Sequence, residues 1–194
     1  MNPYTYLIPP NARLVAEIGG ADQQTKQEFL QIRPDCRYLS FETGEELRQL
    51  HDADCIFYWN RALQDPKLPA ILKRHMDSLR ENGQMIFQLE NPGYFRRILG
   101  LMGGQLLTPA AVPLEVLKNM LEQMGLSVFG IAPFQVKQDE EWRREPETRG
   151  LLQSLEQFAV SHGGAPFRQP WVQSYALRAV KGERPQSVLI QALL

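Results

Sequence analysis

The sequence is poor in the residues that build metal sites and disulfides. It has two cysteines and three histidines among 194 residues, and their spacing matches no zinc-binding pattern. Cys36 and Cys55 each lie in an apolar run typical of a strand, so we expect two buried, reduced thiols. A structural metal site is therefore not expected, and the fold depends on its hydrophobic core.

Long apolar runs and an excess of one charge are also missing. No stretch approaches the ~20 apolar residues that a membrane span requires, and no basic-then-apolar signal opens the chain. The net charge is −1, which gives no overall attraction to nucleic acid or to an anionic membrane. We therefore expect a cytoplasmic protein without a membrane span or a nucleic-acid partner.

The sequence does contain a regular alternation of strand-like and helix-like segments. This alternation predicts an α/β fold of three layers, in which helices cover both faces of a mostly parallel, Rossmann-like sheet. The last two strands are separated by a long excursion with a charged loop and a helix, which predicts an antiparallel hairpin at the C-terminal edge of the sheet. The predicted strands are 13–19, 36–42, 53–60, 84–90, 126–134 and 174–180. The predicted helices are 21–33, 65–81, 94–104, 108–124 and 151–162, and the charged loop is 135–147.

Acidic, small, amide and aromatic residues lie at the carboxyl ends of four of the predicted strands. Ligands of parallel α/β folds bind at the carboxyl ends of the strands, near the point where the strand order reverses. The sequence therefore predicts one functional rim, made of Glu17–Gly20, Glu42, Trp59–Asn60 and Glu90–Asn91.

Four stretches of the sequence together resemble a known family. "VAEIGGADQQ" resembles a cofactor loop often written E-I-G-C-G-D-G, and "YLSFE" resembles the second strand with its terminal acid. The long stretch from "ADCIFYWN" to "QLENPG" and the later "LTPAAVPLEVLKNMLEQMGLSVFGI" complete the pattern. The family is that of class I S-adenosylmethionine (SAM)-dependent methyltransferases, of the kind found in bacterial sugar and polysaccharide pathways and sometimes fused to glycosyltransferases. The resemblance spans roughly residues 13–180.

The resemblance implies a cofactor, an activity and site residues. The cofactor would be SAM, with Glu17, Gly19 and Gly20 around its methionine moiety, because only glycine allows such close backbone approach. Glu42 would accept hydrogen bonds from the ribose hydroxyls. The residues near the transferable methyl would be Tyr58, Trp59 and Asn60. The implied reaction is methyl transfer to a hydroxyl of a sugar or glycan acceptor.

Three departures from the family pattern support a second hypothesis. Ala21 and Gln23 stand where two further glycines are usual, and Asn60-Arg61 replaces a Glu-His pair that could supply a general base. Only residues 43–52 separate the second and third strands, where the family usually has a helix and a strand that hold adenine. The second hypothesis is a non-catalytic, methyltransferase-like module that packs on or recruits a glycosyltransferase.

The two ends of the predicted unit raise questions of organisation. We expect a methyltransferase-like domain over residues 1–183, followed by a tail at 184–194. The tail ends in an apolar run, which is either an edge strand or, as we favour, the first strand of a further domain. The aromatic and basic piece 94–104 is expected to be a substrate lid or a protein interface, and the sequence leaves open whether the chain forms a homo-oligomer.

Overall fold

The computed structural model describes residues 3–20, 23–47, 50–104, 112–135, 140–162 and 169–182. Six strands form one sheet, in the spatial order β2-β1-β3-β4-β6-β5. The part from β2 to β4 is parallel, and β4, β6 and β5 form an antiparallel edge hairpin. The predicted fold class is confirmed. The strands are β1 (Leu14–Ile18), β2 (Arg37–Phe41), β3 (Ala53–Tyr58), β4 (Leu79–Glu90), β5 (Leu126–Gln135) and β6 (Val172–Lys181).

By its internal packing the chain divides into two compact units. Unit 1 consists of Met1–Leu89, Ala111–Ala132 and Ala176–Leu194, and unit 2 of Glu90–Ala110 and Pro133–Tyr175. Unit 1 contains most of the sheet with α1 (Gln24–Ile32), α2 (Leu68–Ser78), α4 (Leu114–Gln123) and the 3-10 turns η1 (Pro3–Leu7), η2 (Gly44–Glu46) and η3 (Asn60–Gln64). Unit 2 contains α3 (Phe95–Met102), α5 (Glu140–Arg144) and α6 (Pro146–Ser161).

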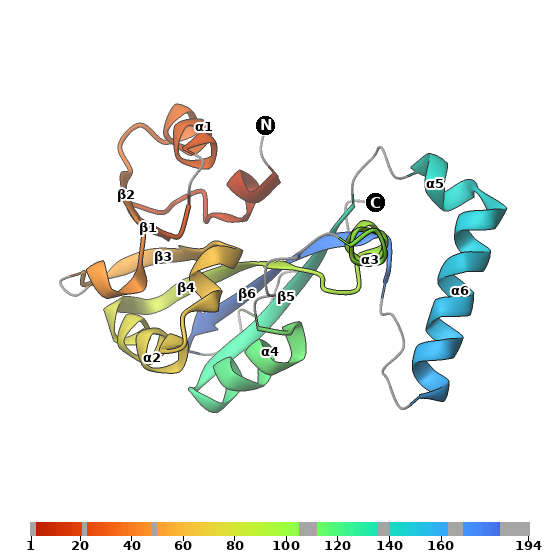
Figure 1. Cartoon of the computed structure of the whole chain (residues 1–194). Coiled ribbons are helices and arrows are strands. Elements are labelled where there is room, and N and C mark those ends of the chain that lie inside the picture. The colour runs from red at the N-terminus through yellow and green to blue at the C-terminus, as the bar shows by residue number, and fades with distance from the viewer. Residues whose placement is uncertain are drawn as a thin grey trace. The chain divides into compact units, whose positions relative to one another are not determined.

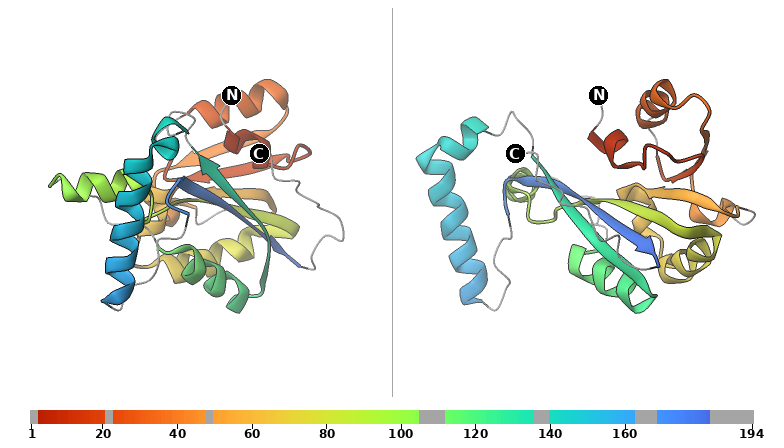
Figure 2. Two further views of the ribbon diagram at one scale, coloured as in Figure 1. Left: turned by 90° about the vertical axis from the view of Figure 1, so that its right-hand side faces the viewer. Right: turned by 180° about the vertical axis from the view of Figure 1, so that it is seen from behind.

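Helices cover both faces of the sheet in unit 1. Two views show α2 and α4 on one face of the sheet, and α1 with η1 on the other (Figures 1 and 2). Every residue of β3 is buried, as expected for a central strand covered on both sides. The core under α2 and α4 is apolar; from the strands it takes Ala16, Ile18, Ile56, Met85, Phe87 and Leu177, and from the helices Leu68, Leu72, Leu117 and Leu121.

Unit 2 has a small core of its own. Tyr94 and Phe95 pack with Leu152 of α6, and Trp171 lies against them. The ring centroids of Phe95 and Trp171 are 4.8 Å apart. The buried Asn91 connects the segment before α3 to the segment at the start of β6. Its Nδ2 donates to the carbonyl oxygens of Gln169 (3.0 Å) and Val172 (2.8 Å).

Several predicted boundaries were wrong. The helix expected to stop at Asn82-Gly83 ends at Ser78, and β4 begins directly at Leu79. Asn82 adopts φ 62°, which asparagine tolerates better than most residues, so these residues form an irregular first part of the strand instead of a helix end. The segment expected to be a charged loop contains α5 and the start of α6. The tail at 184–194 and the predicted helix starts at Asp22 and Thr108 lie outside the described residues.

Candidate functional site

The parallel strands bring the ends of β1, β2 and β3 side by side in unit 1. The paired ends are Ile18 with Phe41, Ile18 with Tyr58, and Tyr58 with Phe87. The order β2-β1-β3 means that the chain leaves β1 on one side and returns on the other, so the topological switch point lies between β1 and β3. The residues directly after β1 and β3 therefore border the crevice in which α/β folds bind ligands.

Glu17 is the buried acid of this rim, with 2% of its surface exposed. Its Oε2 accepts a hydrogen bond from the Tyr38 hydroxyl at 2.7 Å, and its Oε1 accepts one from the Trp59 indole Nε1 at 3.0 Å. Burial, and then the charge of Glu17, raise the pKa of Tyr38 far above its usual range. Tyr38 therefore keeps its proton and acts as a donor, and both carboxylate oxygens of Glu17 are held in fixed positions.

The two glycines after β1 are required by the packing of the chain itself. Gly19 has φ +76°, and a Cβ at this position would lie 2.8 Å from the Cβ of Ala62. A Cβ on Gly20 would lie 1.7 Å from Oε1 of Glu17 and 2.8 Å from Nε1 of Trp59. Gly20 thus makes room for the hydrogen bond between Glu17 and Trp59, in addition to any role in approaching a ligand.

Trp59 is the centre of an aromatic cluster on the face of the sheet that carries η1. Its ring centroid lies 4.8 Å from that of Phe57 and 5.3 Å from that of Tyr4 in η1. The Thr5 hydroxyl donates to Oε2 of Glu28 at 3.1 Å and so connects η1 to α1. Trp59 is half-buried, and these contacts fix the orientation from which its indole reaches Glu17.

Tyr58 lies in the core instead of beside Trp59, because neighbouring side chains of a strand point to opposite faces. Its ring stacks on Phe87 at 5.0 Å, and its hydroxyl is hydrogen-bonded to Nδ1 of His75. The other ring nitrogen of His75, Nε2, lies 2.9 Å from the carbonyl oxygen of Gly44. A carbonyl only accepts, so Nε2 carries the proton, Nδ1 accepts, and Tyr58 donates. Burial lowers the pKa of His75 to about 4, which agrees with this neutral tautomer.

The hydrogen bond between His75 and Gly44 holds the short segment that follows β2 against α2. Gly44 packs so tightly on α2 that a Cβ would lie 2.6 Å from Cγ2 of Ile71. Arg74 of α2 forms an ion pair with Glu45 at 3.2 Å. The described part of residues 43–52 contains the 3-10 turn η2 and no strand.

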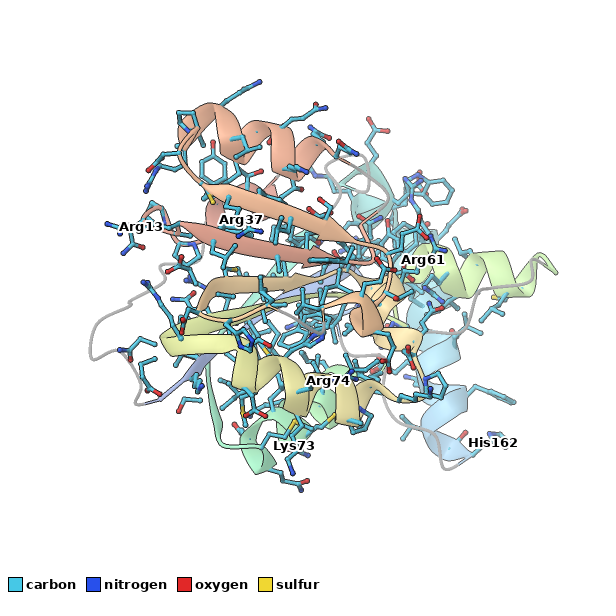
Figure 3. All side chains as sticks on the ribbon, turned by 90° about the vertical axis from the view of Figure 1, so that its left-hand side faces the viewer. Arg13, Arg37, Arg61, Lys73, Arg74 and His162 are labelled. Carbon is cyan, nitrogen blue, oxygen red and sulfur yellow. The ribbon has the colours of Figure 1, made fainter. Side chains whose placement is uncertain are left out.

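The remaining predicted residues differ in exposure. Glu42 is exposed and directly follows β2, while Asn60 is buried and its backbone N–H donates to Oε1 of Gln88 at 3.0 Å. Arg61 is exposed, and Figure 3 shows it at the opposite end of the strands from Arg13 and Arg37. Gln23 precedes α1 and makes no side-chain cap, and Ala21 lies outside the described residues. Glu90 and Asn91 belong to unit 2, where Glu90 pairs with Arg97.

The structure thus places Glu17, Gly19, Gly20, Trp59 and Asn60 around the switch point, with Glu42 at the end of the neighbouring strand. Tyr4, Tyr38 and His75 were not predicted as site residues from the sequence. No local motif marks these residues, because their partners are distant in the sequence: Tyr38 bonds to Glu17, His75 to Tyr58, and Tyr4 packs on Trp59. Over the described ranges, no helix is long and apolar enough to cross a bilayer, and no group of three metal-ligating side chains gathers.

Comparison with solved structures identifies the fold. No protein-family profile and no curated protein matches the chain. A SAM-dependent methyltransferase from Archaeoglobus fulgidus aligns with a TM-score of 0.59 and 17% identity, over 92% of this chain and 90% of that chain. A second one from Mesorhizobium loti has a TM-score of 0.50 and 13% identity, over 92% and 96%. An O-methyltransferase family 2 protein from Planctomyces limnophilus has a TM-score of 0.52 and 12% identity, over 88% and 51%. The chain therefore has the fold of the class I SAM-dependent methyltransferases.

Proposed function

We propose that this protein binds SAM at the rim of unit 1 and transfers its methyl group to a hydroxyl of a sugar or glycan. The observation that carries the proposal is the arrangement of Glu17, Gly19 and Gly20 at the switch point between β1 and β3. It is supported by the likeness of the fold to solved SAM-dependent methyltransferases.

The residues present suit the amino acid end of SAM. Glu17 is a buried carboxylate that accepts hydrogen bonds from two neutral donors, Tyr38 and Trp59. Its negative charge would attract the ammonium group of a methionine moiety. Gly19 lets the backbone turn sharply beside it, with φ +76°.

The ribose would be held at the end of β2. Glu42 is exposed directly after Phe41, whose carbonyl oxygen accepts from the Gly19 N–H at 2.9 Å. This hydrogen bond fixes the spacing between the end of β2 and the glycine loop. When bound, SAM would supply an electrophilic methyl group on a sulfonium, and the residues of this chain would contribute by positioning, since Asn60-Arg61 stands where the Glu-His pair of the family could supply a base.

A second candidate function follows from the segment after β2. Residues 43–47 pack on α2 through contacts with His75, Ile71 and Arg74. In the family, the corresponding segment usually binds adenine, whereas here it packs against a helix. This favours a non-catalytic module that serves as an interaction domain for a glycosyltransferase.

An assay with methyl-labelled SAM separates the two functions. The protein is incubated with labelled SAM and a set of methyl glycosides, and products are separated by chromatography. The first function predicts an O-methylated sugar and an equal amount of S-adenosylhomocysteine (SAH). Absence of labelled product, together with co-purification of the protein with glycosyltransferase activity, supports the second.

A further inference from the structure

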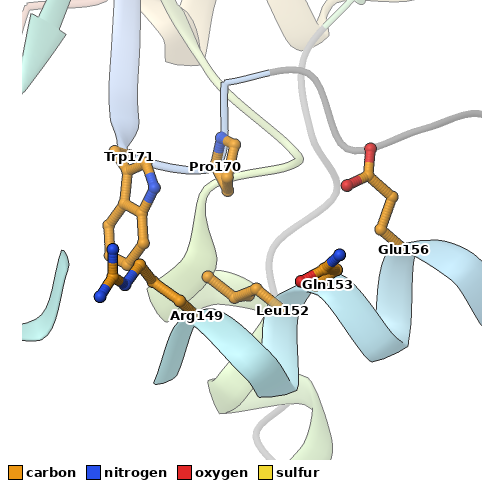
Figure 4. Close-up of a pocket in the computed structure, with 6 residues that line it drawn as sticks. All are labelled: Arg149, Leu152, Gln153, Glu156, Pro170 and Trp171. Carbon is orange, nitrogen blue, oxygen red and sulfur yellow. The ribbon is translucent and has the colours of Figure 1, made fainter. Parts of the chain in front are cut away.

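A groove in unit 2 lies outside the rim and has no role in the proposed methyl transfer. It runs between one side of α6 and the segment that precedes β6 (Figure 4). Its lining residues are Arg149, Leu152, Gln153, Glu156, Pro170 and Trp171. The four residues from α6 are spaced i, i+3, i+4 and i+7, and therefore share one face of the helix.

The floor and one wall of the groove are held by the core of unit 2. Leu152 is 6% exposed and packs with Tyr94 and Phe95. Trp171 is half-buried, with its ring against that of Phe95 at 4.8 Å. The carbonyl oxygen of Pro170 accepts from the Phe95 N–H at 2.8 Å. The apolar surface of the groove is thus fixed, while Arg149 and Gln153 are exposed at its edge.

The lining combines an aromatic ring with donors and acceptors of both charges. Trp171 and Pro170 offer flat apolar surface, Arg149 donates, Glu156 accepts, and Gln153 does both. Because Arg149 and Glu156 carry opposite charges, the lining gives little net attraction to a ligand of either charge. A purely apolar ligand would make no hydrogen bond to the polar groups of the lining. A neutral sugar ring suits all of these groups, because its C–H face can stack on the indole while its hydroxyls both donate and accept.

We propose that this groove binds a neutral saccharide. The C–H face of the ring lies on Trp171, and its hydroxyls accept from Arg149 and donate to Glu156. The proposal does not depend on SAM binding, since all of the lining residues belong to unit 2, whereas Glu17, Gly19, Gly20 and Glu42 belong to unit 1.

Nuclear magnetic resonance tests the site directly. The chain has three tryptophans, so a ¹⁵N-labelled sample gives three indole N–H signals, assigned by replacing Trp59, Trp142 and Trp171 singly with Phe. The probes are the methyl glycosides of glucose, galactose, mannose and rhamnose, added without SAM up to about 50 mM, well above a millimolar Kd. At least one glycoside is expected to shift the Trp171 signal in a saturable way and to leave the Trp59 signal unchanged.

Two variants and a matched control make the test specific. Arg149→Ala and Glu156→Ala each are expected to weaken binding about tenfold, because each removes a charged hydrogen-bonding group. Gln157→Ala, an exposed glutamine on α6 outside the groove, is expected to leave binding unchanged. The proposal is overturned if no glycoside shifts the Trp171 signal of the folded protein, or if both charge variants bind as tightly as the wild type. A positive result with no SAM binding would separate this site from the proposed methyl transfer.

Discussion

The indole N–H of Trp59 and the hydroxyl of Tyr38 each donate a hydrogen bond to one carboxylate oxygen of Glu17, at 3.0 Å and 2.7 Å respectively. The acid at the end of β1 is thereby joined to β2 through Tyr38 and to the end of β3 through Trp59. Its carboxylate is set in position before any ligand arrives, as an efficient binding site requires.

The two donors of Glu17 are expected to act together on stability. Tyr38→Phe and Trp59→Phe each leave a buried carboxylate with one hydrogen bond fewer, at a cost of about 1–3 kcal/mol in the free energy of unfolding. Because both bonds hold the same group, the effects of the double variant should differ from their sum by more than about 0.5 kcal/mol. Urea denaturation measures all three variants; strictly additive effects would show that the carboxylate is not shared in this way.

Gly20 is expected to be far less tolerant than an ordinary glycine. Gly20→Ala places a methyl group 1.7 Å from Oε1 of Glu17, which forces the carboxylate away from Trp59 and costs about 1–3 kcal/mol. Gly150→Ala in α6 is the matched control, since apart from its chain neighbours and the nearby backbone of its own helix no atom lies within 4 Å of its Cβ position. Alanine there is expected to stabilise the helix by about 0.5–1 kcal/mol. Thermal unfolding of both variants checks the contrast, and equal effects would contradict it.

His75 is expected to make the stability depend on pH between about 4 and 6.5. Burial lowers its pKa in the folded protein from 6.5 to about 4, so in this window the unfolded state binds more protons and stability rises with pH. The contribution of neutral His75 to the free energy of unfolding amounts to roughly 3 kcal/mol. It is fully present above pH 6.5 and is lost as the pH falls to 4.

Two variants isolate this contribution from that of other acids. His75→Gln should be less stable than the wild type at pH 7 and should lose part of the pH dependence between 6.5 and 4. Tyr58→Phe removes the hydroxyl partner of His75 but leaves the imidazole buried, so it should keep that dependence. Denaturation curves at several pH values distinguish them, and identical slopes for the wild type and His75→Gln would refute the assignment.

Asn91 is expected to contribute strongly to the stability of unit 2. Its side chain donates to Gln169 and Val172, and its Oδ1 accepts from the Gly93 N–H at 3.0 Å. Asn91→Ala should cost about 2–4 kcal/mol, through the loss of several buried hydrogen bonds. Asn91→Asp should cost more, because a carboxylate oxygen would face two carbonyl oxygens. Hydrogen exchange at the Val172 amide provides a local readout, and faster exchange in the alanine than in the aspartate variant would contradict the argument.

The fold could be predicted from the sequence because its signals are local. Strand-like apolar runs such as 53–58 and the helical spacing of Leu117 and Leu121 depend on residues close in the chain. The boundary at Leu79 could not be predicted, because the pairing of Leu79 with Ala53, a tertiary contact, outweighs the helix-like pattern of the preceding residues.

The candidate site was predictable only in part, for a similar reason. The acid and glycines after β1 form a continuous motif, so Glu17, Gly19 and Gly20 could be named in advance. The bonds that decide what Glu17 and Tyr58 do come from Tyr38, Trp59 and His75 on other elements. Their assignment requires the register of the sheet and the position of α2, which no sequence spacing encodes.

Calorimetric titration with SAM and SAH is the measurement that tests the central claim most directly. We predict that the wild-type protein binds SAH with a Kd in the micromolar range, that Glu17→Ala abolishes binding, and that Glu42→Ala weakens it about tenfold or more. The exposed Glu122 of α4 supplies the control variant Glu122→Ala, which should bind as the wild type does. Absence of binding at millimolar SAM and SAH to a folded protein would contradict the account.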